Sequence, residues 1–410
     1  MLLAIGVAIR TLGAALYYPF LALFLFSVMG VGYLEIGVIF VVVGAIQLPF
    51  GLVGGLWADR VGRRRLILLS LVTESAATAS LAYAFEIRSL YLAVFVAALG
   101  GAILSATGAA FSSYLADWST GSGRTRAFTW YRITFNGGYS AGVALGGTLV
   151  GVIGYAGALL VAATIISVAA AFVAALLPPS PVDLALRAGP PPDPNPGAAP
   201  GNPRRSVGES LRILSRDRAA ILVAVAFVLV YVTIGQWSVT YPLFVHNKLG
   251  ISYALLGAGL ALNGVIVVVG QAFTTESLIG WRHTSIAILG TLLYVGAFLL
   301  LGVAALWVLL PAALFVASVV ILTFGENVAS IPQSTLPSNL APEGEVGAYN
   351  GGFNTVYSAA GLGAIFLGGA VLSYVANPLL EWGLMVLPAI PGIVLLRLAA
   401  RRITGRADRA

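Results

Sequence analysis

The chain of 410 residues has no cysteine and only two histidines, His246 and His283. The absence of cysteine excludes disulfides, thiolate metal sites and a cysteine nucleophile. Two histidines are too few for a histidine-rich metal cluster, and a Ser-His-Asp hydrolase would have to use one of them. A phosphate-binding Gly-Lys-Ser/Thr loop is also absent from the sequence, so direct use of ATP is not expected. We therefore expect a protein that is not an enzyme and that needs neither a metal nor another cofactor.

Charged side chains are scarce as well. They make up 9% of the chain, whereas soluble globular domains carry about a quarter. Hydrophobic residues make up 59%, and the mean hydropathy is +0.96. So few charges could not cover the surface of a soluble protein of this length, so lipid must surround most of the chain. The 49 glycines agree with this, because helices in a bilayer pack closely through small residues.

Long apolar stretches indicate how the chain is organised. A stretch that crosses a bilayer must be helical, because hydrocarbon offers its backbone groups no hydrogen-bond partner. Twelve such stretches are predicted, at residues 4–28, 33–57, 66–86, 90–115, 128–150, 155–177, 219–244, 253–275, 284–303, 306–331, 348–374 and 380–399. The predicted fold class is therefore an all-α membrane protein with twelve transmembrane helices in two halves of six.

A polar segment, residues 178–218, joins the halves 1–177 and 219–410, and the second half ends in a short basic tail. The segment is rich in proline and glycine, so its first part is expected to be a flexible or polyproline-like linker. Its last part, from Ser206, is expected to form a short amphipathic helix with Leu211 and Leu214 on the apolar side.

The basic residues predict an orientation. All but two of the 22 lie on the side of the membrane that holds the linker, the exceptions being Arg88 and Lys248. The positive-inside rule then places the linker and both termini in the cytoplasm. This distribution also accounts for the net charge of +7, so no nucleic-acid partner is expected.

The two halves repeat each other weakly. Tyr33 is followed by glycines four and eleven residues later, and Tyr253 is followed by glycines at the same spacing. A Gly-Gly pair in the fifth span, residues 146–147, has a counterpart in the eleventh, residues 368–369. Such echoes favour the parallel repeat of two six-helix halves found in some transporters.

Residues 55–65, between the second and third spans, read GLWADRVGRRR. Glycines let the chain turn sharply here, the aspartate can lie against a helix N-terminus, and the arginines hold the loop at the inner interface. Any inner loop between two spans collects arginines, so the arginines alone are not specific. The combination of the glycines and Asp59 with the arginines at this spacing is specific.

This loop resembles the signature G-x-L-a-D-r-x-G-r-[rk]-[rk] of the major facilitator superfamily. In that family the aspartate braces against the start of the eleventh span, and the arginine four residues later pairs with an acid at the end of the fourth. The matching residues here are Asp59, Arg63 and Asp117. The resemblance implies a cytoplasmic latch that favours the outward-facing state and is formed by Gly55, Asp59, Arg60, Gly62, Arg63 and Asp117.

Residues 138–147, GYSAGVALGG, resemble the fifth-span signature of the drug:proton antiporter branch, with Val143 in place of the usual proline. The fourth span has Gly100 and Gly101 where many antiporters have an arginine. The resemblance implies a monomeric secondary transporter in the cytoplasmic membrane that exports a small apolar or amphipathic molecule in exchange for protons. The two departures leave an uptake symporter, or a sugar or metabolite carrier, as the alternative. A channel or a membrane-embedded enzyme is disfavoured, because the halves are duplicated and no catalytic cluster is visible.

Among the ionisable residues inside predicted spans, four stand out: Arg10, Glu74, Arg132 and Glu326. Each costs about 2.5–3.5 kcal/mol to insert, so each is a functional candidate. Arg10 and Arg132 lie near span ends and could instead snorkel to the interface. Glu74 lies about 13 Å into the third span, where its carboxyl group must be protonated or paired. Glu326 is the preferred proton-linked or substrate-contacting carboxylate.

A central cavity in the resembled architecture would be lined by polar and aromatic side chains. The candidates are Tyr17, Gln47, Asn136, Tyr231, Gln236, Trp237, Tyr241, Asn263, Asn327, Asn354 and Tyr357. Each aromatic side chain could instead anchor or pack a helix, and each amide could join two helices by a hydrogen bond.

Overall fold

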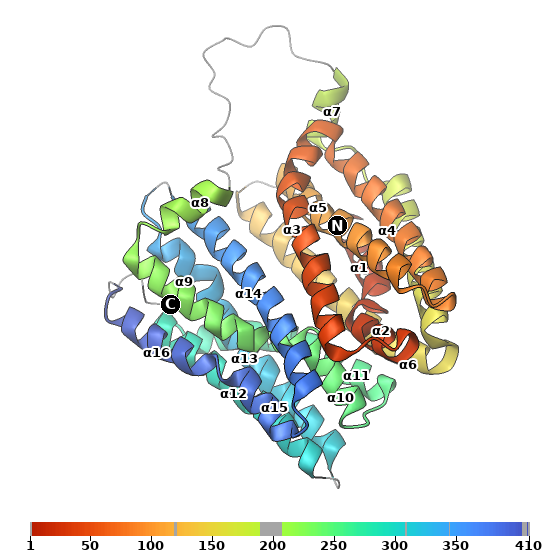
Figure 1. The fold of residues 1–410 in the computed structure, drawn as a ribbon. Helices are drawn as coiled ribbons and strands as arrows, with labels where there is room; N and C mark the ends of the chain where they lie inside the picture. Colours follow the sequence, from red (N-terminus) through yellow and green to blue (C-terminus); the bar gives the residue numbers. More distant parts are fainter. Residues whose placement is uncertain are drawn as a thin grey trace. The chain divides into compact units, whose positions relative to one another are not determined.

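The computed structural model describes residues 2–118, 121–188, 207–307, 310–343, 345–403 and 408. Within these ranges all regular elements are helices (Figure 1). The elements up to the linker are α1 (Leu2–Ala15), η1 (Tyr18–Phe20), α2 (Leu21–Met29), α3 (Tyr33–Val61), α4 (Arg63–Glu86), α5 (Leu90–Asp117), α6 (Gly121–Leu176) and α7 (Pro181–Ala188). The remaining elements are α8 (Val207–Leu214), α9 (Arg218–Ile234), η2 (Gly235–Trp237), α10 (Thr240–Asn247), α11 (Tyr253–Ser277), α12 (His283–Leu306), α13 (Pro311–Leu340), α14 (Val346–Tyr374), α15 (Pro378–Val386) and α16 (Ala389–Ala400).

Helix α6 explains why the described residues contain eleven apolar membrane-length helices. Its apolar part, Trp130–Leu176, has 47 residues, more than twice the roughly 20 that one crossing needs. Gly154 interrupts it with φ 70° and ψ −179°, a conformation that is essentially restricted to glycine. The predicted spans 128–150 and 155–177 are the two arms of this broken helix. The chain is therefore an all-α membrane protein, and with α6 counted as two crossings it has twelve spans.

Two other predicted spans are also interrupted. A 3₁₀ turn separates α1 from α2, and another separates α9 from α10. Pro19 in the first turn and Pro242 at the start of α10 lack the N–H group that a continuous helix would use.

Contrary to the prediction, the first part of the linker is not wholly flexible or polyproline-like. Residues Pro181–Ala188 form the helix α7, which contacts α4 (Figure 1). Ser180 and Asp183 explain this helix. The Ser180 amide donates to Asp183 Oδ2 at 2.7 Å, and the Asp183 amide donates to Ser180 Oγ at 3.2 Å. This reciprocal capping, with Pro181 at the first helical position, stabilises a helix start.

The amphipathic helix predicted at the end of the linker is α8. Leu214 on this helix is only 5% exposed and packs into a hydrophobic core, whereas Leu211 is 36% exposed. The core therefore holds only part of the predicted apolar side.

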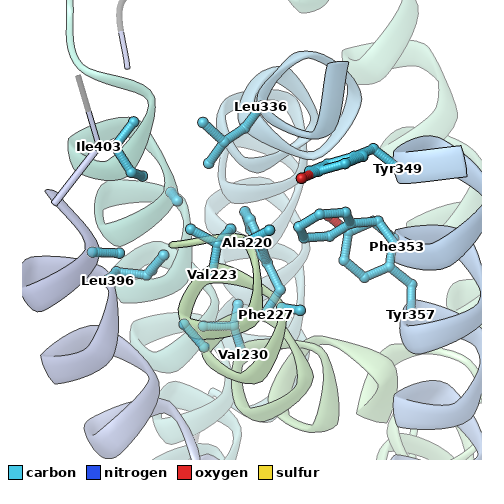
Figure 2. Close-up of a cluster of buried hydrophobic side chains, with 14 of the residues drawn as sticks. Ala220, Val223, Phe227, Val230, Leu336, Tyr349, Phe353, Tyr357, Leu396 and Ile403 are labelled. Carbon is cyan, nitrogen blue, oxygen red and sulfur yellow. The ribbon is translucent and has the colours of Figure 1, made fainter. Parts of the chain in front are cut away.

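The chain forms two compact units. The first contains residues 1–31, 39–201 and 252–264, and the second contains residues 32–38, 202–251 and 265–410. In the first unit, buried side chains of α1, α4, α5 and α6 form the core around Val7, Ile67, Phe111 and Ile166. In the second, Phe227 of α9 packs against Phe353 and Tyr357 of α14, and Leu396 of α16 lies on the opposite side of α9, near Val223 (Figure 2).

Candidate functional site

An ion pair joins the start of α4 to the end of α5. Arg63, the first residue of α4, donates from Nε to Oδ2 of Asp117, the last residue of α5. The Arg63 side chain is 10% exposed and the Asp117 side chain 15%. Because α4 and α5 are joined by a short turn, the start of one helix lies beside the end of the other. This is the contact that the family resemblance implies for these two residues.

Gly62 precedes this arginine with φ 98° and ψ 142°, in the region that favours glycine. A Cβ atom at this position would also collide with Oδ1 of Asp183, so the glycine makes room for that carboxylate. Arg60, near the end of α3, is exposed. The side chains of Gly55 and Asp59 lie outside the described residues, so the predicted brace by Asp59 stays a prediction.

Two further residues contribute to this region but were not among the predicted site residues. They are Arg64, at the start of α4, and Asp183, on α7. The Arg64 amide donates to Oδ2 of Asp183 at 3.2 Å. The Arg64 side chain donates to the carbonyl groups of Leu177 and Ala174, both at 2.6 Å, at the end of α6. The pattern Ser-Pro-x-Asp at residues 180–183 is the sequence signal for the capping residue, although it does not reveal that Asp183 reaches back to α4.

Two of the four intramembrane charges pair with each other. Arg10 Nε and Nη2 donate to Oε2 and Oε1 of Glu74, both at 2.8 Å. The two residues are only 7% and 3% exposed. Arg10 is therefore held inside the unit instead of reaching the interface, and Glu74 has the paired arrangement. This bidentate pair ties α1 to α4.

The other two charges lie in different surroundings. Arg132, on α6, is exposed. Glu326, on α13, is half-buried, and its charge acts on the hydroxyl groups of Tyr231 and Tyr294. Glu326 therefore lies near two tyrosines on two other helices of the second unit, α9 and α12.

Several predicted cavity residues of the second unit instead hold helices together. Gln236 is fully buried, and its Nε2 donates to the carbonyl of Ala364 at 3.0 Å. Tyr241 is also fully buried and shares a 3.2 Å hydrogen bond with Ser318. Asn327, likewise buried, donates to the carbonyl of Ile266 at 3.4 Å. These contacts fit the alternative role of such side chains, which is to pack a helix or to join two helices by a hydrogen bond.

Tyr231 and Tyr357 lie together in the second unit. Their rings stack with centroids 4.5 Å apart and an interplanar angle of 6°. Tyr231 is half-buried, and Tyr357 is 9% exposed with no hydrogen-bond partner for its hydroxyl among the described residues. Trp237 is half-buried beside Tyr241, at a ring distance of 4.7 Å, and Asn354 is exposed on α14.

Four of the predicted cavity residues lie in the first unit. Tyr17, Gln47 and Asn136 are half-buried, and Asn263 is 7% exposed. Gln47 lies against Gly101, and its amide occupies the space that a side chain at position 101 would need.

The glycine echoes mark two matched helix crossings, one within each unit. In the first unit, a Cβ atom on Gly147 of α6 would lie 3.1 Å from the Cα of Gly257 on α11. In the second, a Cβ atom on Gly369 of α14 would lie 3.1 Å from the Cα of Gly37 on α3. Each crossing therefore needs a residue without a side chain, and the repeat seen in sequence has a structural counterpart.

The family model of the Major Facilitator Superfamily matches residues 3–365. The chain belongs to this superfamily. It is therefore a multi-pass membrane transporter and not an enzyme.

The chain is similar to several known proteins of different description. An uncharacterized MFS-type transporter of Bacillus subtilis, YttB, is 23% identical, with 94% of this chain and 91% of that protein covered. The class E tetracycline resistance protein of Escherichia coli is 36% identical over 111 residues, which are 27% of this chain and 26% of that one. The crystal structure of the nucleoside transporter NupG superposes with a TM-score of 0.75 at 14% identity, covering 98% of this chain and 99% of that one. The last likeness concerns the fold alone.

Proposed function

We propose that this transporter exports a small apolar or amphipathic molecule from the cytoplasm across the cell membrane in exchange for protons. The observation that carries this proposal is the 36% identity to a tetracycline resistance protein over 111 residues. A membrane transporter can give resistance to a compound by removing it from the cell. The linker and both termini are cytoplasmic in this proposal, as the arginine distribution indicates.

Alternating access requires a device that holds one state until substrate or protons bind. The Arg63–Asp117 pair is the proposed device, as a latch at the cytoplasmic end of the first unit. Both side chains are largely shielded from water, so removing one leaves the other as a poorly solvated charge. Opening and closing of this contact would shift the balance between the inward-facing and the outward-facing state.

Glu326 is the proposed proton-exchanging residue. Glu74 is held by two hydrogen bonds from Arg10. Glu326 is half-buried and lies within electrostatic range of Tyr231 and Tyr294. Tyr231, which is half-buried and stacks on Tyr357, offers an aromatic surface near this carboxylate, which suits a flat or amphipathic substrate.

Tetracycline accumulation in everted vesicles tests the proposal. Vesicles that contain the transporter should accumulate labelled tetracycline when their interior is acid, and a protonophore should abolish the accumulation. Glu326→Gln should lose this proton-driven accumulation but keep the exchange of labelled for unlabelled tetracycline, because that exchange needs no net proton transfer. Glu276→Gln, which neutralises an exposed carboxylate on α11, is the matched control and should behave as the parent does. Accumulation that is independent of the transporter, or that survives Glu326→Gln, contradicts the proposal.

A second candidate is proton-linked uptake of a metabolite such as a nucleoside. It is favoured by Gln47, whose amide fills the space beside Gly101 where many antiporters have an arginine. Right-side-out vesicles should then accumulate labelled uridine when their exterior is acid. Tetracycline accumulation in everted vesicles without any uridine uptake rejects this candidate.

A further inference from the structure

The chain that follows α6 folds back onto the start of α4. Oδ2 of Asp183 accepts hydrogen bonds from the amides of Arg64, at 3.2 Å, and Ser180, at 2.7 Å. Arg64 in turn donates to the last carbonyl groups of α6. The carboxylate of Asp183, 5% exposed, therefore stabilises the start of α4 and the start of α7 at once.

The second unit contains the same device. Oδ1 of Asp408, in the chain that follows α16, accepts a hydrogen bond from the Thr284 amide at the start of α12, at 2.9 Å. Arg282 donates from Nε to Oδ2 of Asp408 at 2.7 Å and from Nη2 to the carbonyl of Ala400, the last residue of α16. Asp408 is fully buried.

The capping contacts of Asp183 and Asp408 are made at the same position of their helices. Gly62 and Arg282 are the N-cap residues of α4 and α12, so each aspartate accepts from the amide of the second helical residue. In each unit the acid comes from the chain after the sixth predicted span and binds the start of the third. In the first unit, the residue between the N-cap Gly62 and the bonded amide of Arg64 is Arg63. Arg63 is the residue that forms the proposed latch with Asp117.

We propose that Asp183 is a positioning residue for transport, which fixes the start of α4 so that Arg63 reaches Asp117. This inference rests on the proposed latch. The Arg63 side chain leaves the backbone one residue before the amide that Asp183 binds, so a shift of the helix start moves both groups. The end of α5 is tied to the same segment, because the Tyr114 hydroxyl donates to the carbonyl of Pro178 at 2.8 Å. Asp183 and the Tyr114–Pro178 hydrogen bond therefore join the two partners of the latch to the first residues of the linker.

The absence of natural cysteine makes a direct test possible. Ala116 is half-buried and directly precedes Asp117, so Ala116→Cys in the full chain gives a single thiol whose labelling by N-ethylmaleimide reports opening of the α4–α5 end. In this parent, Asp183→Asn should speed labelling about tenfold, which corresponds to about 1.4 kcal/mol and lies near the lower bound for a hydrogen bond to a charged group. Asp117→Asn should have a similar effect. The double variant should match either single variant, because both act through one contact.

Asp408→Asn is the matched control. It removes the negative charge of the equivalent cap in the other unit and should lower the melting temperature as Asp183→Asn does, yet leave labelling at position 116 unchanged. If Asp183→Asn lowers the melting temperature without changing the labelling, or if the two effects multiply in the double variant, Asp183 only stabilises the fold and the inference is wrong. If Asp117→Asn itself leaves labelling unchanged, the proposed latch fails first. Should Asp183→Asn not fold, Asp183→Glu, which keeps an acceptor for the Arg64 amide, enters the same cycle.

Discussion

At the scale of single residues, the Arg10–Glu74 pair separates a structural role from a proton-carrying one. Glu74→Gln leaves Arg10 buried without its counter-charge, and we expect it to cost about 3–5 kcal/mol of stability. The double variant Arg10→Met/Glu74→Leu, which removes both charges, should recover most of this loss. Melting temperatures of the purified variants measure both effects. An unchanged melting temperature for Glu74→Gln, together with lost proton-driven transport, would instead make Glu74 a proton carrier.

The same pair shows what sequence could and could not predict at this scale. Arg63–Asp117 was predictable because the loop resembles a family signature whose arginine pairs with an acid at the end of the fourth span. Arg10–Glu74 was not, since α1 is apolar on almost every side and its sequence does not tell which face meets α4. Gln236 and Tyr241 were predicted to line a cavity because the sequence does not tell which face of their helix meets a neighbour. In the structure, each instead forms a hydrogen bond to another helix.

At the scale of helices, twelve apolar stretches were predictable from length and hydropathy alone, because hydrocarbon enforces the helix. What joins two stretches is decided by single residues. Gly154 adopts φ 70° and ψ −179°, so Gly154→Ala should cost about 1–3 kcal/mol. Gly151→Ala is the control: it is a helical site with open space around its Cβ position, and alanine there should be neutral or stabilising by up to about 1 kcal/mol. Equal melting temperatures for the two variants would show that the break in α6 is not at Gly154.

At the scale of the whole molecule, helix α4 links local geometry to membrane orientation. Its start is bonded to Asp183, and its 24 residues span about 36 Å, enough to cross a bilayer, before ending at Glu86. Cysteines at the exposed positions Leu184 and Glu86 should therefore lie on opposite sides of the membrane. In intact cells a membrane-impermeant maleimide should label Glu86→Cys at once but Leu184→Cys only after permeabilisation, because the arginines keep the linker in the cytoplasm. Labelling of Leu184→Cys in intact cells would reverse the orientation and place the Arg63–Asp117 pair at the external face, where it could not be a cytoplasmic latch.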